Sequence, residues 1–248
     1  MKIALIGYGK MGKMIESIAL DRGHEIVLII DQANADDLNH ENLRKVDVAI
    51  EFSTPNTVLN NINTCIKTKT PLIVGTTGWY GHLQKVKDDC LSNNSTLMYG
   101  SNFSVGVNIF FQINQQIAKM MNKFSDQYDV GMEEIHHIHK LDSPSGTAIT
   151  IAEDIITEFE KKNQWVDIKA NEEDVTLHSP EHLIIESYRE GEVAGTHAVI
   201  YDSDVDRIEL KHIAHSRQGF ALGAVIAAEW LADKKGFYSV KEMYDFNE

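Results

Sequence analysis

The 248-residue sequence has few cysteines, fewer basic than acidic residues, and no long apolar run. Its two cysteines, Cys65 and Cys90, lie far apart and lack the spacing of a CxxC pair or a metal site, so we expect reduced cytosolic thiols. Lys and Arg number 23 against 37 Asp and Glu, which gives a formal net charge of -14. This acidic balance argues against a nucleic acid or an anionic membrane surface as the partner.

No stretch approaches the roughly 20 consecutive apolar residues of a membrane span. The N-terminal run "IALIG" is also too short for the apolar core of a signal peptide. Hydrophobic residues make up 43% of the chain and charged residues 24%, a balance typical of a globular protein with a substantial core. These features predict a cytoplasmic protein with no membrane partner.

The first hundred residues alternate short apolar runs with segments of helical period, a pattern typical of a parallel sheet with crossover helices. Val, Ile and Leu dominate the runs without strict alternation, as expected of strands covered on both faces. Helices are expected over residues 11–22 and 56–67, the second with Pro55 near its start. The expected strands are "KIALIG", "EIVLIID", "VDVAIEF", "PLIVGTT" and "STLMYG".

After Asn108 the pattern changes to that of a separate α+β domain. A helix around residues 110–120 leads to the strand-like "YDVGMEEIHHI" and to a second helix over about 146–161. The polar residues 162–181 are expected to form a loop. The runs "HLIIESYREG", "GTHAVIYD" and "RIELKHIA" predict a mostly antiparallel or mixed sheet. A final helix over 220–232 is rich in Ala and Gly, which allows close packing.

The motif "GYGKMG" places a complete G-x-G-x-x-G at Gly7, Gly9 and Gly12, between an expected strand and an expected helix. In that context the glycines permit a tight turn, close approach of a pyrophosphate to the backbone, and helix-to-strand packing. Asp31 ends the second strand, where a carboxylate can accept hydrogen bonds from the adenosine ribose. The fold class is therefore α/β, with an N-terminal Rossmann-like dinucleotide-binding domain. The alternative is a glycine-rich turn without a dinucleotide.

Asp31 also bears on the choice of cofactor. A carboxylate followed by Gln32, and not by a basic residue, would repel the 2'-phosphate of NADPH. NADH is therefore slightly favoured, although Lys10 and Lys13 could partly compensate that repulsion. Two further loops, "GTTG" at 75–78 and "GSNFSVGVN" at 100–108, follow the fourth and fifth strands, where ligands of open α/β sheets bind.

Three histidines and a lysine crowd into the stretch "HHIHK" at 136–140. Metal binding is disfavoured because no fourth ligand is apparent and the lysine would repel a cation; partly exposed histidines at a strand end are another alternative. The stronger interpretation joins histidine acid/base chemistry to Lys140 and to a helix start at Ser145, Gly146 and Thr147, whose free amides and hydroxyls can face a carboxylate. This combination predicts a pocket for a small acid that is protonated as it reacts.

The stretch "EEIHHIHKLDSPSGTA" resembles the signature of the 4-hydroxy-tetrahydrodipicolinate reductase family of bacterial lysine and diaminopimelate biosynthesis. The likeness spans nearly the whole chain, through the glycine loop, "EFSTP", "GTTG", "NFSVGVN", "REGEVAGTH" and "SRQGFALGAVIAAEWL". It implies a dinucleotide-binding domain formed by residues 1–105 and 217–248. It further implies a central α+β domain, residues 106–216, that binds a small dicarboxylate substrate and assembles a homotetramer.

The resemblance also implies roles for particular residues. His136 would be the general acid/base and Lys140 the proton donor, while His137, Gly146 and Thr147, together with Ser145, would bind the substrate carboxylates. NADH or NADPH would supply a hydride. The residues expected to hold the cofactor are Gly7, Tyr8, Gly9, Lys10, Met11, Gly12, Asp31, Gly75, Thr76, Thr77, Gly100, Ser101, Asn102 and Phe103. No metal is implied.

The sequence departs from the family pattern in places. Gly131 and Glu133 differ from the usual residues before the histidines, which affects strand packing more than chemistry. The glycine loop is a residue shorter than in many members, and the basic residue that often follows the acidic ribose contact is absent, which leaves NADH versus NADPH open. Two alternatives also remain: a dehydrogenase acting on an amino-acid imine or semialdehyde, and a catalytically silent dinucleotide sensor.

Overall fold

The computed structural model describes residues 1–169 and 179–244 and divides into two compact units. The first unit comprises residues 1–105 and 218–248, and the second comprises 106–217. Arg217, expected in the first unit, therefore falls in the second. Among the described residues, no helix is long and apolar enough to cross a membrane.

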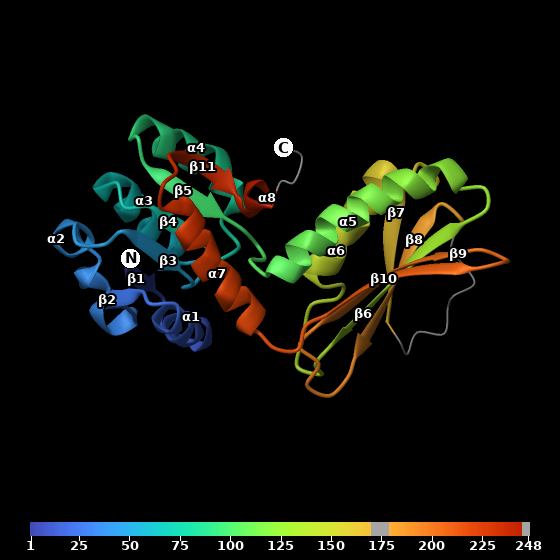
Figure 1. Cartoon of the computed structure of the whole chain (residues 1–248), viewed down its shortest axis with the longest axis horizontal. Coiled ribbons are helices and arrows are strands. Elements are labelled where there is room, and N and C mark those ends of the chain that lie inside the picture. Colours follow the sequence, from blue (N-terminus) through green and yellow to red (C-terminus); the bar gives the residue numbers. More distant parts are fainter. Residues whose placement is uncertain (170–178, 245–248) are drawn as a thin grey trace. The chain divides into compact units, whose positions relative to one another are not determined.

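The first unit is built on a parallel sheet in the order β11-β5-β4-β3-β1-β2 (Figure 1). The five N-terminal strands confirm the prediction, whereas β11 has no counterpart in it, because a four-residue edge strand has too little pattern to identify. The strands are β1 (Lys2–Ile6), β2 (Glu25–Ile30), β3 (Val48–Glu51), β4 (Leu72–Val74), β5 (Thr96–Tyr99) and β11 (Gly236–Ser239).

Helices cover both faces of this sheet. Ile3 and Leu5 pack against α1 (Lys10–Asp21) and α7 (Gln218–Leu231), while Ala4 and Ile6 face the core that contains α3 (Val58–Thr68) and α4 (Leu83–Ser92). Alternate residues of β1 thus serve two cores, which explains its continuous apolar run. The remaining helical segments are η1 (Gln32–Asp37), α2 (His40–Leu43), η2 (Tyr80–His82) and α8 (Val240–Met243).

The small residues of α7 allow the close packing expected of them. A Cβ added at Gly223 would lie 1.7 Å from the carbonyl oxygen of Phe103, so the helix meets the chain after β5 at backbone contact. The start of α3 differs from the expectation, because Pro55 lies in a turn and the helix begins at Val58.

The second unit contains a mixed sheet in the order β10-β9-β6-β8-β7. The pairs β10-β9 and β9-β6 are antiparallel, and β6-β8 and β8-β7 are parallel, so the predicted sheet is confirmed in its mixed form. The strands are β6 (Asp129–His136), β7 (Gln164–Lys169), β8 (His182–Arg189), β9 (Thr196–Asp202) and β10 (Arg207–Ile213).

The prediction of a loop over residues 162–181 is wrong for residues 164–169, which form β7. Trp165, Val166 and Ile168 are only partly buried in this strand, so its apolar pattern is weak, and pairing with β8 determines its conformation. Residues 170–178 of that predicted loop lie outside the described residues.

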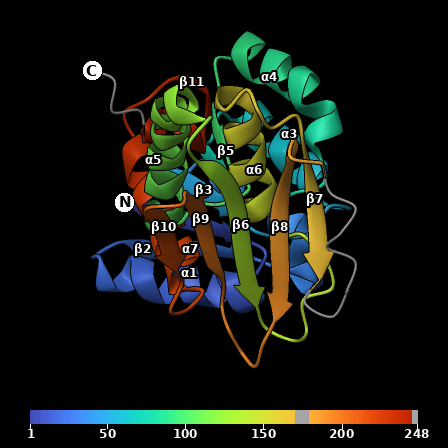
Figure 2. The same ribbon diagram turned by 90° about the vertical axis from the view of Figure 1, so that its right-hand side faces the viewer.

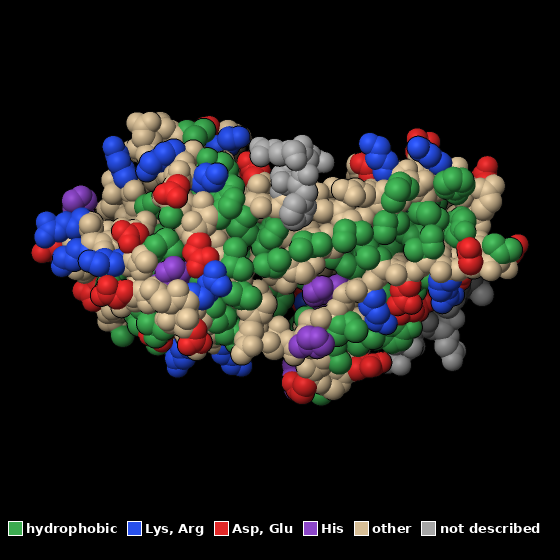
Figure 3. All heavy atoms as spheres, in the orientation of Figure 1, with side chains coloured by type: hydrophobic (Ala, Val, Ile, Leu, Met, Phe, Trp, Pro, Cys, Tyr) green, Lys and Arg blue, Asp and Glu red, His purple; other side chains and the backbone are tan. Residues whose placement is uncertain are grey.

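Two helices, α5 (Val105–Met121) and α6 (Gly146–Glu158), pack on one face of the mixed sheet (Figure 2). A short turn, η3 (Asn122–Phe124), follows α5. Along β6 buried residues alternate with partly exposed ones, so Val130, Met132, Glu134 and His136 share the buried face. Hydrophobic side chains also form a band over α5 at the surface, where Ile113, Met120 and Phe124 are exposed (Figure 3).

Candidate active site

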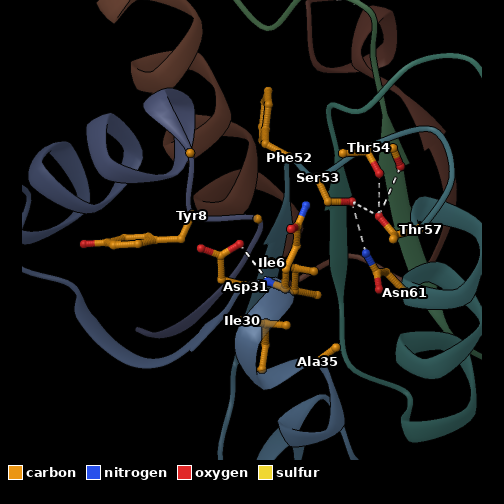
Figure 4. A pocket seen from close by; sticks show the side chains of 13 residues that line it. Ile6, Tyr8, Ile30, Asp31, Ala35, Phe52, Ser53, Thr54, Thr57 and Asn61 are labelled. Atoms are coloured by element: carbon orange, nitrogen blue, oxygen red, sulfur yellow. Dashed lines mark hydrogen bonds between the residues drawn. The ribbon is translucent and has the colours of Figure 1, made fainter.

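In the first unit the glycine loop borders a pocket of about 250 Å³ at the carboxyl ends of β1, β2 and β3. Asp31 lies beside Tyr8 on one side of this pocket, and Ser53, Thr57 and Asn61 lie on the other (Figure 4). The lining residues are Ile6, Gly7, Tyr8, Gly9, Ile30, Asp31, Gln32, Ala35, Phe52, Ser53, Thr54, Thr57 and Asn61.

The three glycines of the motif serve different purposes. Gly7 has φ of +93°, and a Cβ there would lie 2.2 Å from the carbonyl oxygen of Phe52. A Cβ at Gly12 would lie 2.3 Å from the carbonyl oxygen of Gly7, whereas one at Gly9 would meet nothing within 4 Å. Gly9 is also the N-cap of α1, where no side chain caps the first-turn amides. These features fit a pyrophosphate at the helix N-terminus.

Asp31 follows the end of β2, where Rossmann-like folds place a carboxylate that binds ribose. Its Oδ1 accepts a hydrogen bond from the backbone N–H of Gln32 at 2.7 Å, and its own N–H donates to Asn34 Oδ1 at 2.7 Å, which fixes the turn after β2. No ion pair joins Asp31 to a basic residue in the described part of the chain. Lys13 lies over the Tyr8 ring instead, with Nζ 5.8 Å from the ring centroid.

A buried carboxylate supports the far wall of this pocket. Glu51, at the end of β3, is fully buried, and burial raises its pKa, although hydrogen bonds from Ser53 and Asn61 oppose that shift. Ser53 donates to Glu51 through its backbone N–H at 3.1 Å and also through its hydroxyl. Asn61 Nδ2 donates to Ser53 Oγ at 3.1 Å. The sequence interpretation noted "EFSTP" but assigned its residues no place in the pocket.

Several predicted cofactor residues lie outside the pocket lining. A Cβ at Gly75 would lie 2.1 Å from the Phe52 ring, and one at Gly100 would lie 2.8 Å from Val240. Phe103 belongs to the core and is 2% exposed, so its side chain serves packing. Contact of these loops with a cofactor stays a prediction. The other predicted residues outside the lining are Lys10, Met11, Gly12, Thr76, Thr77, Ser101 and Asn102.

In the second unit the C-terminal end of β6 places Glu134 and His136 on one buried face. His136 is 8% exposed, Glu134 is fully buried, and His136 Nδ1 lies 3.5 Å from Glu134 Oε2. His197 of β9 is 5% exposed and its ring meets that of His136 edge-on, with centroids 5.1 Å apart. Sequence reasoning missed Glu134 and His197. Alternation along the predicted strand could have placed Glu134 beside His136.

Both buried histidines are held neutral near pH 7. Burial lowers the pKa of His136 from its ordinary value of 6.5 to about 4, with the Glu134 carboxylate opposing the shift and Lys140 and Arg189 adding to it. Burial likewise lowers the pKa of His197 to about 3, and the neighbouring His136 contributes in the same direction. A neutral imidazole at His136 can accept or relay a proton.

The predicted helix start lies next to these histidines. Ser145 is the N-cap of α6, because its Oγ accepts the N–H of Ala148 at 3.1 Å. Ser145 Oγ also exchanges a hydrogen bond with His197 Nε2 at 3.1 Å, and the Ser145 N–H donates to Glu134 Oε2 at 3.0 Å. The prediction of a free amide and hydroxyl at Ser145 is therefore wrong. A Cβ at Gly146 would meet no atom within 4 Å, so the space beside this residue is open, and its free amide stays a prediction.

His137 and Lys140 lie in the segment between β6 and α6. Lys140 Nζ donates to Asp142 Oδ2 at 2.7 Å and is 19% exposed, so its ammonium is partly desolvated and has one carboxylate partner. His137 follows the end of β6, and its Nε2 lies 3.4 Å from the guanidinium of Arg217. Thr147 occupies the first turn of α6. The second unit thus brings His136, Lys140 and the start of α6 to one end of its sheet.

The same groups form a donor set that metal ions use. One ligand atom from each of Glu134, His136 and His197 lies within 4.8 Å of the other two. However, both oxygens of Glu134 already accept hydrogen bonds, and the Arg189 guanidinium lies 3.0 Å from one of them. An ion would have to displace these donors beside a cation. We interpret the cluster as a hydrogen-bond network, and the absence of a metal stays a prediction.

A dinucleotide pocket in one unit and a histidine–lysine cluster beside a helix start in the other define an NAD(P)-linked oxidoreductase. The chain belongs to the dihydrodipicolinate reductase family. Residues 1–103 match the family described as "Dihydrodipicolinate reductase, N-terminus", and residues 106–244 match "Dihydrodipicolinate reductase, C-terminus".

Individual relatives agree with this assignment. The 4-hydroxy-tetrahydrodipicolinate reductase of Christiangramia forsetii is 46% identical over 98% of this chain and 97% of its own length. The 4-hydroxy-tetrahydrodipicolinate reductase of Neisseria meningitidis is 32% identical over 94% of this chain and 84% of its own length. Among solved structures, a dipicolinate-bound dihydrodipicolinate reductase from Paenisporosarcina sp. TG-14 has a TM-score of 0.79 and covers 98% of this chain and 99% of its own, at 23% identity. This structural likeness establishes the fold.

Proposed function

We propose that the chain reduces 4-hydroxy-tetrahydrodipicolinate to tetrahydrodipicolinate with NADH or NADPH, in the pathway to diaminopimelate and lysine. The observation that carries the proposal is the cluster in the second unit, where buried neutral His136, partly desolvated Lys140 and the open helix start at Gly146 lie at one end of the sheet. Relatives named for this reaction match nearly the full chain and support it.

In this proposal His136 is the general acid/base and Lys140 the proton donor. Gly146 and Thr147 hold a substrate carboxylate with amides at the N-terminus of α6, where the helix dipole favours negative charge. His137 binds the second carboxylate. When bound, the reduced nicotinamide supplies the hydride. Because Ser145 is engaged by Glu134, Ala148 and His197, its role is to position the helix start.

The residues of the first unit fit a dinucleotide. Gly9 leaves room for phosphate at the start of α1, and Asp31 lies where a ribose binds. Because no basic residue pairs with Asp31 among the described residues, we propose a modest preference for NADH over NADPH. Replacement of Asp31 by Asn would weaken NADH binding and narrow that preference, which parallel titrations with both cofactors would measure.

The domain roles and the assembly are part of the proposal. The first unit binds the cofactor, while the second binds the dicarboxylate and forms a homotetramer. A cytoplasmic location and the absence of nucleic-acid and membrane partners stay predictions from composition.

An absorbance assay at about 340 nm, the band of reduced nicotinamide, tests the reaction. Substrate is generated freshly from aspartate semialdehyde and pyruvate by the preceding synthase, and each cofactor is added in turn. Substrate-dependent oxidation by the wild-type chain supports the proposal. Cofactor binding without oxidation would contradict it and would favour the imine dehydrogenase or the silent sensor.

A further inference from the structure

The strand register places Glu134 at the centre of a buried polar row. Glu134 of β6 is paired with His197 of β9 on one side and with Ser187 of β8 on the other. Glu134 is fully buried, Ser187 is 3% exposed and His197 is 5% exposed. Burial of a carboxylate this deep destabilises the fold unless its oxygens are hydrogen-bonded. The contacts of Glu134 therefore indicate its role.

The two carboxylate oxygens of Glu134 face different partners. Oε2 accepts the N–H of Ser145 at 3.0 Å and lies 3.5 Å from His136 Nδ1. Oε1 accepts from Ser187 Oγ at 3.1 Å and from the Arg189 guanidinium at 3.0 Å. The oxygen Oε2 therefore contacts the helix start and faces the acid/base imidazole at the same time, while Oε1 is held from the other side.

The other ring nitrogen of His136 points to a different environment. A Cβ added at Gly195 would lie 3.1 Å from His136 Nε2, and Gly195 has φ of +149°, which side chains rarely tolerate. Gly195 thus keeps the space at Nε2 free of a side chain. A negative charge near Nδ1 favours the tautomer with its proton on Nδ1, which leaves the Nε2 lone pair on the open side.

We propose that Glu134 is a positioning residue that orients His136 as an Nδ1–H imidazole and fixes the N-terminus of α6 through Ser145. One carboxylate then aligns the acid/base group with the helix amides that receive a substrate carboxylate. The 3.5 Å separation from Nδ1 is longer than a hydrogen bond, and such contacts tighten when a substrate is bound. This inference rests on the proposed role of His136.

The charges around His136 define how the Glu134 charge acts. The groups that face His136 are Glu134 on its own strand, His197 on β9, Arg189 on β8, and Lys140 and Asp142 in the following loop. The two cations disfavour an imidazolium and the two carboxylates favour it. Loss of the Glu134 charge would leave the cations less opposed, so a protonated His136 would be harder to form during turnover.

The test compares Glu134→Gln with Glu153→Gln. Glu153 is the control because it lies in the same unit, on α6, and its side chain is exposed. We expect Glu134→Gln to lower kcat by roughly 10- to 100-fold and to move the acidic limb of the pH profile, where neutral His136 becomes protonated, to lower pH, with unchanged NADH affinity. Glu153→Gln should resemble the wild type. Equal behaviour of the two variants would overturn the inference.

A double-mutant cycle separates positioning from general stability. If Glu134 acts through His136, Glu134→Gln should cost less than about 3-fold in a His136→Ala background, because the group it orients is already absent. Independent, multiplicative losses would overturn the inference even if both single variants are impaired.

A spectroscopic measurement keeps this result distinct from failure of the proposed function. ¹⁵N NMR of the His136 imidazole reports which ring nitrogen carries the proton, whatever substrate the enzyme uses. We expect Nδ1–H in the wild-type chain and a shift toward Nε2–H in Glu134→Gln. A wild-type Nε2–H tautomer would contradict the inference and leave the reductase assay unaffected. An inactive wild-type chain with the expected tautomer would instead contradict the proposed function.

Discussion

At the scale of single residues, the proposed reaction depends on His136 and Lys140, which the second unit brings to one end of its sheet. Replacement of His136 or Lys140 by Ala should lower the turnover rate by about two to four powers of ten, the usual contribution of a positioned acid or base. NADH affinity, measured by fluorescence titration, should be unchanged, because the glycine loop and Asp31 belong to the first unit. Loss of cofactor binding in either variant would contradict this division of roles.

The buried histidines also make stability depend on pH. Burial holds the pKa of His136 at about 4 and that of His197 at about 3, below the ordinary value of 6.5. Between these values the unfolded chain binds more protons than the folded one, so the free energy of unfolding falls as pH drops from about 6.5 toward 4. Each histidine contributes a slope of up to about 1.4 kcal/mol per pH unit.

Denaturant unfolding at several pH values would measure this slope. The carboxylates also titrate in this range, so the wild type is compared with His197→Gln, which removes one titrating group and should flatten the curve. The slope is the readout, because the substitution also changes the overall stability. An identical slope in both proteins would contradict the assignment of His197 as a histidine buried in its neutral form.

At the scale of elements, the glycine loop contains one glycine that the fold requires, Gly7, and one that we expect cofactor binding to require, Gly9. Gly7→Ala should destabilise the first unit by about 1–3 kcal/mol or more, since it forces a side chain into a positive φ beside the Phe52 backbone. Gly9→Ala should leave the melting temperature nearly unchanged, because Gly9 has φ of -80° and open space around it. It should nevertheless weaken NADH binding, because the new methyl group would occupy the proposed phosphate site. Calorimetry and cofactor titration would measure both effects, and equal melting temperatures in the two variants would refute the contrast.

The elements also show how far one sequence predicts this protein. Buried strands such as β1 and amphipathic helices such as α1 are identified by their own pattern, and the glycine loop is identified by its context between them. The edge strands β7 and β11 escape prediction because pairing with β8 and with β5, and not local composition, determines them. The candidate site divides in the same way. His136 and Lys140 lie in one motif, whereas His197 joins them only through the register of β9 against β6.

At the scale of the whole molecule, the mixed sheet has one face that no described helix of its own unit covers. Helices α5 and α6 cover the other face. The uncovered face has a hollow of about 490 Å³, lined in part by Ile184 and Ile200 with Glu133, Glu186 and Arg207 around them. Apolar side chains with a charged rim are typical of an interface, so we expect the proposed homotetramer to use this face.

Light scattering on the purified chain tests this expectation. The wild type should have four times the mass of the 27.9 kDa chain. Ile200→Glu, which places a charge in the hollow of the uncovered face, should release smaller species. Met120→Glu is the control, because Met120 is 57% exposed on α5 and belongs to the other layer of the unit. If Met120→Glu dissociates the assembly while Ile200→Glu leaves it intact, the interface lies on the apolar band of α5 instead. A monomeric wild type would refute the proposed tetramer.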